Sequence, residues 1–288
     1  MTVILKGADT ASAIRNNLTE AIHAYHLTPC LAVVRVGCKD SDLAYEKGLA
    51  STCAKTGIEL KVFELPETIE ETAFEDAFQK INQDPAIHGI LLFRPLPSHL
   101  DEKRITQLID PSKDVDCMNP VNLAKLFMGD TDGFAPCTAE AVIRILDHEG
   151  VSLNGAKAVV IGRSLVIGKP LSILLLSRNA TVTCCHSRTR DLAGECRGAD
   201  ILISACGAAN LVDETIAKGL DASCTAIDVG VNFVDGKMCG DFDFDAVSHY
   251  AGKVTPVPGG VGAVTNTVLA AHVVLAACRM AGYPDVKL

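Results

Sequence analysis

A glycine-bounded turn near the middle of the chain has the character of a phosphate-binding loop. Residues 162–168 read Gly-Arg-Ser-Leu-Val-Ile-Gly and follow the apolar, β-branched run of residues 158–161. Glycines after a strand permit a tight turn, and they let backbone N–H groups approach a pyrophosphate at the start of the next helix. Pro170 suits the first turn of that helix, because its missing N–H costs nothing there. The spacing is not the common G-x-G-x-x-G, so a purely structural turn between strand and helix stays open.

The next strand of this half ends in groups that suit a phosphate. Residues 180–185 run into a segment that reads His-Ser-Arg-Thr-Arg, and the first acid after them is Asp191. An NAD site usually places a carboxylate at this point, where it accepts from the ribose 2′-hydroxyl. The hydroxyl of Ser187 and the guanidinium of Arg188 suit a 2′-phosphate instead, and Arg163 can supply a second guanidinium from the glycine turn. The pattern predicts NADP rather than NAD, unless these arginines are simply solvated.

Strands and helices alternate around these residues. In the first half, strand-like runs at residues 31–36, 60–65 and 89–93 are separated by helical patterns. The second half continues the alternation, with further strands predicted at residues 201–205 and 226–229. Alternation of this kind indicates parallel βαβ units. The sequence therefore predicts an α/β fold, whose second half is a doubly wound unit.

The chain also divides into two expected domains. Residues 110–137 are rich in turn-forming residues, which is typical of a loop that carries a site. A helix over residues 138–148 connects to the second half. We expect a first domain over residues 1–137 with the C-terminal helical segment 265–288 returning to it, and a second domain over residues 138–264. That last helix has few polar residues on any face, so we expect it to be buried.

The composition is that of a soluble globular enzyme. Apolar residues make up 48% of the 288 residues, and the net charge of -9 argues against nucleic acid or an anionic membrane as the main partner. No apolar run reaches the ~20 residues that span a bilayer, and residues 1–20 lack the apolar core of a signal peptide, so a cytoplasmic location is expected. The twelve cysteines include no C-x-x-C pair. We expect reduced, mostly buried thiols and no metal site.

Several segments, in family order, resemble the methylenetetrahydrofolate dehydrogenase/cyclohydrolase (FolD) family. They are residues 95–97, 111–116, 136–138, 160–164 with 168–170, 179–183 with 186–189, and 255–262. The resemblance covers nearly the whole chain. It implies a folate-binding catalytic domain followed by a Rossmann-like NADP domain, and a hydride transfer from the one-carbon bridge of the substrate to the nicotinamide. It also implies a homodimer that acts in one-carbon metabolism.

The resemblance implies roles for particular residues. The family's tyrosine, which packs on the pterin ring, falls at Tyr45, and its pterin-binding aspartate falls at Asp116. Taken alone, these two would be an ordinary helix tyrosine and a turn-capping aspartate. Further substrate contacts are implied for Pro258, Gly259 and Gly260. Cofactor contacts are implied for Gly162, Arg163, Ser164, Gly168, Pro170, Ser187, Arg188, Cys206, Gly207 and Val231.

The chain departs from the family pattern where cyclohydrolase chemistry takes place. That step adds water to the methenyl carbon, and the family uses a lysine four residues after the tyrosine, supported by a glutamine before the Pro-Leu-Pro segment. Leu49 and Phe93 stand at these two positions. Lys47 lies about 200° around the helix from Tyr45, and Arg94 cannot act as a base near neutral pH. Loss of a positioned acid or base removes ~10²–10⁴-fold in rate, so we expect very weak or absent cyclohydrolase activity unless another group replaces the lysine.

Other departures affect the expected folate site. Cys117 follows the aspartate where glycine is usual, and a side chain there costs about 1 kcal/mol if φ is positive. Ala263 and Val264 stand where the family continues Pro-Met, and His272 stands where a helix asparagine is common. A histidine on an apolar helix is more often a satisfied core residue than a catalyst. These changes leave open a different pterin substrate.

The leading prediction is an NADP-dependent oxidation of 5,10-methylenetetrahydrofolate to the methenyl form. Three alternatives remain at this stage. The first is a full bifunctional dehydrogenase/cyclohydrolase with a substitute base. The second is a non-catalytic protein that binds folate or NADP, and the third is a dehydrogenase for a different one-carbon carrier.

Overall fold

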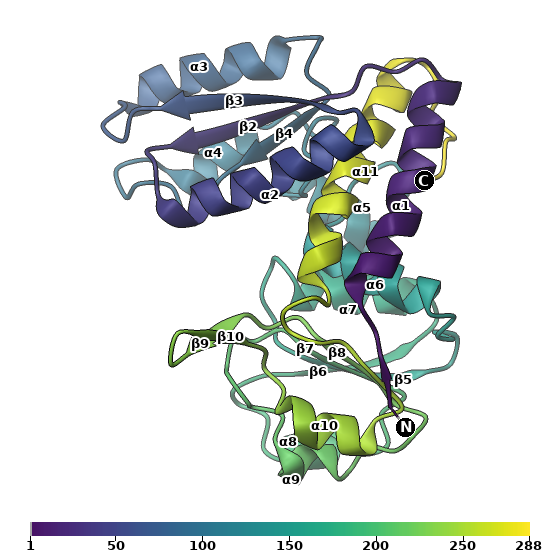
Figure 1. The fold of residues 1–288 in the computed structure, drawn as a ribbon. Helices are drawn as coiled ribbons and strands as arrows, with labels where there is room; N and C mark the ends of the chain where they lie inside the picture. The colour runs from purple at the N-terminus through teal and green to yellow at the C-terminus, as the bar shows by residue number, and fades with distance from the viewer. Residues whose placement is uncertain (1) are drawn as a thin grey trace. The chain divides into compact units, whose positions relative to one another are not determined.

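The computed structural model describes residues 2–288, without the side chain of residue 41, and it divides into two compact units (Figure 1). One unit contains residues up to Ser12 together with Thr138–Thr265, and we call it the six-stranded unit. The other contains Ala13–Cys137 and Asn266–Leu288, and we call it the three-stranded unit. Helices α1 (Gly7–Ala24) and α11 (Gly262–Met280) each run across this division.

The three-stranded unit is built on a parallel sheet in the order β3-β2-β4. Its strands are β2 (Cys30–Val36), β3 (Glu59–Leu65) and β4 (Gly89–Leu92). All seven residues of β2 are buried, as expected for the central strand of a covered parallel sheet. The helices of this unit, besides parts of α1 and α11, are α2 (Asp40–Thr56), α3 (Glu71–Gln83), α4 (Glu102–Leu108) and α5 (Pro120–Met128). Helix α2 ends at Gly57, whose left-handed conformation lets its N–H donate to the carbonyl of Cys53.

The six-stranded unit holds a parallel sheet in the order β1-β11-β8-β7-β5-β6. Its strands are β1 (Val3–Ile4), β5 (Lys157–Ile161), β6 (Thr181–Cys185), β7 (Ile201–Ser204), β8 (Thr225–Asp228) and β11 (Lys253–Val254). A small antiparallel hairpin pairs β9 (Asn232–Val234) with β10 (Lys237–Cys239). The helices are α6 (Cys137–His148), α7 (Gly168–Ser177), α8 (Leu192–Cys196), α9 (Glu214–Ala217) and α10 (Phe244–Tyr250).

The first strand joins this sheet rather than the unit that follows it in sequence. Val3 pairs with Lys253, and Ile4 pairs with Val254. The pairing of β1 differs from the domain predicted over residues 1–137. A strand of two residues shows no hydrophobic periodicity, so the sequence pattern carried no signal for it.

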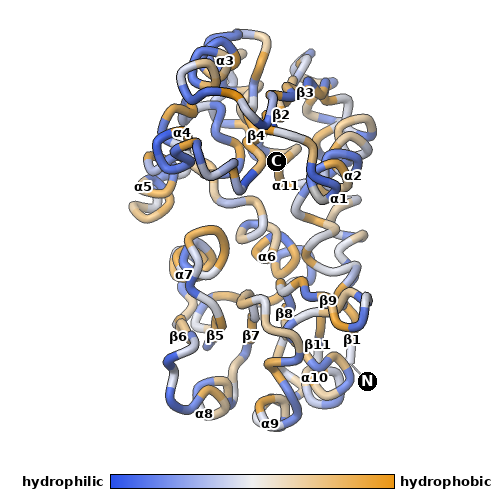
Figure 2. The backbone as a smooth tube through the Cα atoms, turned by 90° about the vertical axis from the view of Figure 1, so that its left-hand side faces the viewer, coloured by the Kyte–Doolittle hydropathy of each residue, from blue (hydrophilic) through white to orange (hydrophobic). Residues whose placement is uncertain are grey.

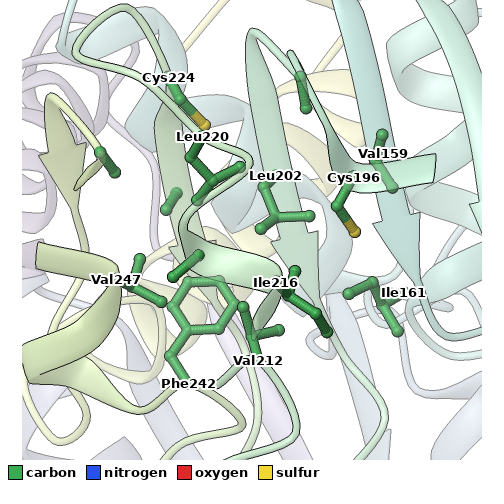
Figure 3. Close-up of a cluster of buried hydrophobic side chains, with 14 of the residues drawn as sticks. Val159, Ile161, Cys196, Leu202, Val212, Ile216, Leu220, Cys224, Phe242 and Val247 are labelled. Carbon is green, nitrogen blue, oxygen red and sulfur yellow. The ribbon is translucent and has the colours of Figure 1, made fainter. Parts of the chain in front are cut away.

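A hydrophobic cluster packs on one face of the six-stranded sheet (Figure 3). Val159 and Ile161 of β5 both point into it, as alternate residues of a strand do. Cys196 and Cys224 lie within the cluster as small apolar side chains. The twelve cysteines are all free thiols, and eight of them are buried. The expected use of cysteine as a core residue is therefore confirmed.

Helix α11 is the most apolar long helix among residues 2–288. By length and composition alone it could cross a membrane, although we had expected no such segment. In its most apolar window, 67% of the residues are buried inside the protein, which is the behaviour of a core helix. The expectation that this helix is buried holds, and its apolar character is explained by packing.

Candidate active site

The glycine turn lies between β5 and α7, and both of its glycines are required by geometry. Gly162 has φ +128°, and a Cβ on it would collide with the carbonyl oxygen of Ala205 at the end of β7. A Cβ on Gly168 would collide with the carbonyl oxygen of Gly162 and would lie 2.8 Å from the nitrogen of Arg163. The backbone of the turn therefore folds tightly against the start of α7, a largely hydrophobic helix in the hydropathy colouring of Figure 2. This arrangement leaves the helix N-terminus accessible to an anion.

Ser164 holds the turn in shape. Its hydroxyl oxygen accepts from the N–H of Ile167 at 3.0 Å, and its carbonyl oxygen accepts from the N–H of Lys169 at 3.0 Å. Arg163 and Ser164 are exposed, whereas Gly168 and Pro170 are buried. The turn thus offers a guanidinium and a hydroxyl to solvent over a rigid backbone.

A cavity of about 360 Å³ lies beside this turn, at the carboxyl ends of the strands. Ile167 lines it from the turn, Gly207 from the segment after β7, and Val229 and Val231 from the segment after β8. Strand β6 lies on one side of β5 and β7 on the other, so the order of the sheet switches direction here. Crevices at such a switch point are where open parallel sheets bind ligands.

A buried carboxylate fixes the loop that forms one wall of this cavity. Asp241 is fully buried, and its Oδ2 accepts from the hydroxyl of Ser204 at 2.8 Å and from the N–H of Cys206 at 2.9 Å. Its Oδ1 accepts from the N–H of Ala208 at 2.8 Å and from the side-chain amide of Asn232 at 3.0 Å. Burial raises the pKa of this carboxyl, but the hydrogen bonds from Cys206, Asn232 and Ser204 outweigh burial and lower the pKa overall. The sequence analysis missed Asp241.

A second buried acid, Asp228, supports the first. Its carboxylate accepts from the backbone N–H groups of Gly230, Asp241 and Phe242 at 2.9–3.0 Å. Burial raises the pKa of Asp228 to about 6, although those three hydrogen bonds act in the opposite direction. A Cβ on Gly230 would collide with the carboxylate of Asp241, so the segment after β8 needs glycine there. The two acids together fix the segments that follow β7 and β8.

Cys206, which was expected to contact the cofactor, lies in this network. Its thiol donates to Asp241 Oδ2 at 3.2 Å, and the side chain is exposed beside Gly207. Partial burial and the nearby Asp241 charge raise the pKa of this thiol to about 11, against a lowering by Ser204. The thiol is therefore protonated at neutral pH and is no nucleophile.

The turn after β6 leaves Ser187 and Arg188 exposed at the carboxyl end of the sheet. It is held by a pair of hydrogen bonds, from the N–H of Thr189 to the carbonyl of His186 at 2.8 Å and from the N–H of His186 to Thr189 Oγ1 at 2.9 Å. The first acid in this segment, Asp191, accepts from the N–H of Gly194 at 2.8 Å and caps α8. Its carboxylate is thus used in a helix cap.

The glycine-rich loop before α11 is fixed from two sides. Pro258 follows a cis peptide bond, and Gly259 has φ +101°. A Cβ on Gly260 would collide with the carbonyl oxygen of Pro256, and the N–H of Gly7 donates to the carbonyl of Gly259 at 2.9 Å. Pro258 and Gly259 remain exposed. These expected substrate contacts belong to the six-stranded unit.

In the three-stranded unit, Tyr45 packs against Phe93, and Leu49 lies one turn further along the same helix. The rings of Tyr45 and Phe93 lie 5.5 Å apart between centroids, at 56° to each other. Tyr45 is 40% exposed, Phe93 is 8% exposed, and Leu49 one turn further along α2 is completely buried. The two positions where the resemblance expects a lysine and a glutamine thus make an apolar surface beside the tyrosine.

Asp116 lies within electrostatic reach of this tyrosine. Its Oδ1 accepts from the N–H of Cys137 at 3.1 Å, and the side chain is half-buried. Desolvation, and then the nearby charges of Asp116 and Cys137, raise the pKa of the Tyr45 hydroxyl. That hydroxyl stays protonated and can donate a hydrogen bond. The next residue, Cys117, has φ +56°. Because φ is positive, a side chain at this position carries the conformational cost that glycine would avoid.

Two cations of the three-stranded unit and the histidine of α11 have defined partners. Arg35, buried in β2, pairs with Glu46 at 3.0 Å and with Glu64 at 2.8 Å. Lys39, which precedes α2, donates from Nζ to the carbonyl of Pro95 at 3.1 Å, two residues beyond Phe93. His272 is buried in α11 with its Nδ1 2.7 Å from the carbonyl of Val115 and its ring 5.1 Å from that of Phe134. It is the satisfied core residue that the sequence analysis favoured.

Comparison with known proteins identifies the family. Residues 5–116 match the model of the tetrahydrofolate dehydrogenase/cyclohydrolase catalytic domain, and residues 136–281 match the model of its NAD(P)-binding domain. The chain belongs to the tetrahydrofolate dehydrogenase/cyclohydrolase (FolD) family. The predicted two-domain α/β fold with a Rossmann-like second domain is confirmed.

Relatives in this family match the chain over almost its whole length. The bifunctional protein FolD of Alkaliphilus oremlandii is 49% identical over 284 residues, which cover 97% of this chain and 98% of that protein. The crystal structure of the bifunctional FolD enzyme from Campylobacter jejuni is 35% identical, with a TM-score of 0.92 over 97% of this chain and 99% of that one. The FolD structure from Trypanosoma brucei, complexed with NADP cofactor and inhibitor, is 33% identical, with a TM-score of 0.88 over 96% of this chain and 98% of that one.

Proposed function

We propose that this chain is an NADP-dependent 5,10-methylenetetrahydrofolate dehydrogenase whose methenyltetrahydrofolate cyclohydrolase activity is very weak or absent. Membership of the FolD family supports the dehydrogenase and the folate substrate. The loss of the second activity is proposed from the packing of Phe93 on Tyr45 and from the buried, apolar Leu49 one turn along α2.

The six-stranded unit fits NADP. Gly162 and Gly168 create a cradle that a Cβ would fill, and the pyrophosphate would lie at the positive N-terminal end of α7. Ser187 and Arg188, with Arg163, hold the 2′-phosphate through charge-assisted hydrogen bonds. When bound, NADP supplies the acceptor for the hydride. The NADP in the Trypanosoma brucei relative supports the same choice here.

The dehydrogenase step asks little acid–base chemistry of the protein. The product is a stabilised methenyl cation, so no strong base is needed to form it. Tyr45 packs against the pterin and donates through its protonated hydroxyl, while Asp116 accepts from the polar edge of the pterin. Alignment of the one-carbon bridge and exclusion of water then determine the rate.

The cyclohydrolase step needs an acid–base group, which Leu49 and Phe93 do not provide. Water must be deprotonated as it adds to the methenyl carbon, and a group that carries protons near pH 7 has to stand beside that carbon. Leu49 and Phe93 carry no such group. The missing acid–base catalysis is worth ~10²–10⁴-fold in rate.

One observation favours a second candidate, a full bifunctional enzyme. Lys39 reaches the carbonyl of Pro95, on the segment that directly follows Phe93, and its ammonium is a candidate for a substitute acid–base group. The relatives at 46–49% identity carry the name bifunctional protein FolD. Substitution Lys39→Met would abolish hydrolysis if this lysine supplied it.

A split assay on purified protein tests the proposal. One arm follows reduction of NADP, and separately of NAD, with methylenetetrahydrofolate, and the other follows loss of added methenyltetrahydrofolate against a no-enzyme control. We expect NADP reduction without accelerated hydrolysis, and a gain of hydrolysis in the double variant Leu49→Lys, Phe93→Gln. Melting temperatures of both single variants control for the cost of burying a lysine.

The other outcomes discriminate between the alternatives. Rapid hydrolysis by the unmodified protein contradicts the proposal and supports the bifunctional candidate. Ligand binding without turnover in either arm indicates a binding protein, and NADP reduction only with another carrier indicates a different substrate. We also expect a cytoplasmic homodimer with no nucleic-acid or membrane partner, and light scattering on the purified protein measures its mass.

A further inference from the structure

Asn266, in the first turns of α11, carries a polar atom without a partner. Its side-chain oxygen Oδ1 is buried, and no described residue hydrogen-bonds it. A buried amide oxygen left in this state is costly, and native proteins satisfy nearly all such groups with protein, water or ligand. An orphaned amide beside a candidate substrate site therefore points to a missing partner.

The amide of Asn266 lies over the helix that carries Tyr45. A Cβ built on Gly48 would lie 3.4 Å from Asn266 Nδ2, an ordinary van der Waals contact, so the amide packs directly against this part of α2. Glycine within a helix is unfavourable relative to alanine, yet it stands here in the middle of α2. Gly48 is three residues after Tyr45, and residues at that spacing share one helix face. Asn266 and Tyr45 are thus presented on the same side of α2.

The face of α2 that carries Tyr45 and Gly48 is apolar at the position next to Gly48. Leu49 is buried beside Gly48, and Phe93 packs on Tyr45. The amide of Asn266 is therefore a neutral hydrogen-bonding group on a surface that lacks a titratable one. An amide offers an NH₂ donor group and a carbonyl acceptor, which exchange places when the group turns about its Cβ–Cγ bond. It does not titrate, so it can orient a ligand but cannot act as the base of a cyclohydrolase.

We propose that Asn266 is a substrate-positioning residue, whose amide hydrogen-bonds the polar edge of the reduced pterin ring that packs on Tyr45. The proposal rests on the proposed function, because it takes a reduced pterin as the ligand. It adds a recognition contact from α11 to those of Tyr45 and Asp116.

The test compares Asn266→Leu with the unmodified protein by calorimetric titration with tetrahydrofolate. We expect the Kd for tetrahydrofolate and the KM for methylenetetrahydrofolate to rise about tenfold, which is the loss of one hydrogen bond. The KM for NADP should stay within twofold. The melting temperature should hold or rise, because an apolar side chain of similar volume replaces an unpaired polar one. Thr267→Val, the neighbouring buried position, is the matched control and should change none of these values.

A second variant separates recognition from stability. Gly48→Ala places a methyl group in van der Waals contact with the amide and improves helix propensity, so we expect a higher melting temperature with a Kd for tetrahydrofolate within twofold of the unmodified protein. In the Asn266→Leu background the same change should have no further effect on Kd. An unchanged Kd in Asn266→Leu, or a lower melting temperature without a change in Kd, overturns the proposal. Turnover by the unmodified protein tests the proposed function separately, since the Kd comparison does not depend on turnover.

Discussion

Arg188 carries much of the expected preference for NADP over NAD. It is exposed after the end of β6, and the next acid in the sequence, Asp191, caps α8. A charge-assisted hydrogen bond contributes about 1.5–3 kcal/mol, so Arg188→Ala should raise the KM for NADP by about 10–100-fold. The KM for NAD should change less than twofold, because NAD has no 2′-phosphate. Steady-state kinetics with both cofactors measure this.

Arg190 provides the control for that experiment. It is exposed in the same segment and carries the same charge. If Arg190→Ala weakens NADP binding as much as Arg188→Ala does, the effect is general attraction rather than recognition. An equal loss for NAD and NADP would likewise contradict the assignment of Arg188 to the 2′-phosphate.

Cys117 pays a conformational cost that glycine would not. Its φ of +56° is unfavourable for a residue with a Cβ, and its thiol is buried. Cys117→Gly and Cys117→Ala both lose the buried thiol, but only glycine removes the strain. We expect the glycine variant to be more stable than the alanine variant by about 1 kcal/mol. Urea denaturation of the pair measures the difference, and an alanine variant of equal or higher stability would refute this account.

The sequence indicated some residues of the site and not others, for a physical reason. Tyr45, Asp116 and the glycine turn lie in segments whose local spacing resembles a family pattern. Asp241 receives most of its hydrogen bonds from residues 33–37 positions away in sequence, and Asn266 is notable only because its side-chain oxygen lacks a partner. Buried networks of this kind have no local signature, because folding alone brings their members together.

At the scale of elements, the segment 206–208 after β7 depends on one carboxylate. Asp241→Asn replaces an acceptor of several hydrogen bonds by an amide, whose NH₂ faces N–H donors. We expect the free energy of unfolding to fall by at least about 2 kcal/mol, and the KM for NADP to rise because the cavity wall loosens. Ser204→Ala removes one of these hydrogen bonds and should cost about 1 kcal/mol. Urea denaturation and cofactor kinetics check both values, and equal effects of the two substitutions would contradict a central role for the carboxylate.

Long elements were predictable, and short ones were not. The predicted strand at residues 60–65 is observed as Glu59–Leu65, and the predicted connector helix at residues 138–148 as Cys137–His148. Strand β1 and the hairpin of β9 and β10 were missed. Strands of two or three residues contain too few side chains to show an alternation, and pairing with distant segments determines them.

At the scale of the whole molecule, Asp228 links stability to pH. The pKa of Asp228 is about 6 in the folded protein, against about 3.9 in an unfolded chain. The folded state therefore binds this proton more tightly, and the resulting stability, present below pH ~4, is lost as pH rises through 6. Its full size is on the order of 2–3 kcal/mol. Asp241, whose pKa is lowered, contributes in the opposite sense and loses its stabilisation as pH falls.

The variant Asp228→Asn isolates that contribution. We expect the unmodified protein to lose unfolding free energy relative to the variant between pH 5 and pH 7. Thermal melts or urea titrations at both pH values measure it. A difference that does not change with pH would show that Asp228 is ionised throughout this range.

The pairing of β1 with β11 has a consequence for the order in which the protein is made. Strand β1 is synthesised about 250 residues before its partner, β11. The three-stranded unit also waits, because it includes residues from Asn266 to the C-terminus. A nascent chain therefore holds two incomplete units until almost all of it has been synthesised. Chains stopped before residue 253 should consequently remain sensitive to protease in both halves, whereas the finished chain resists it.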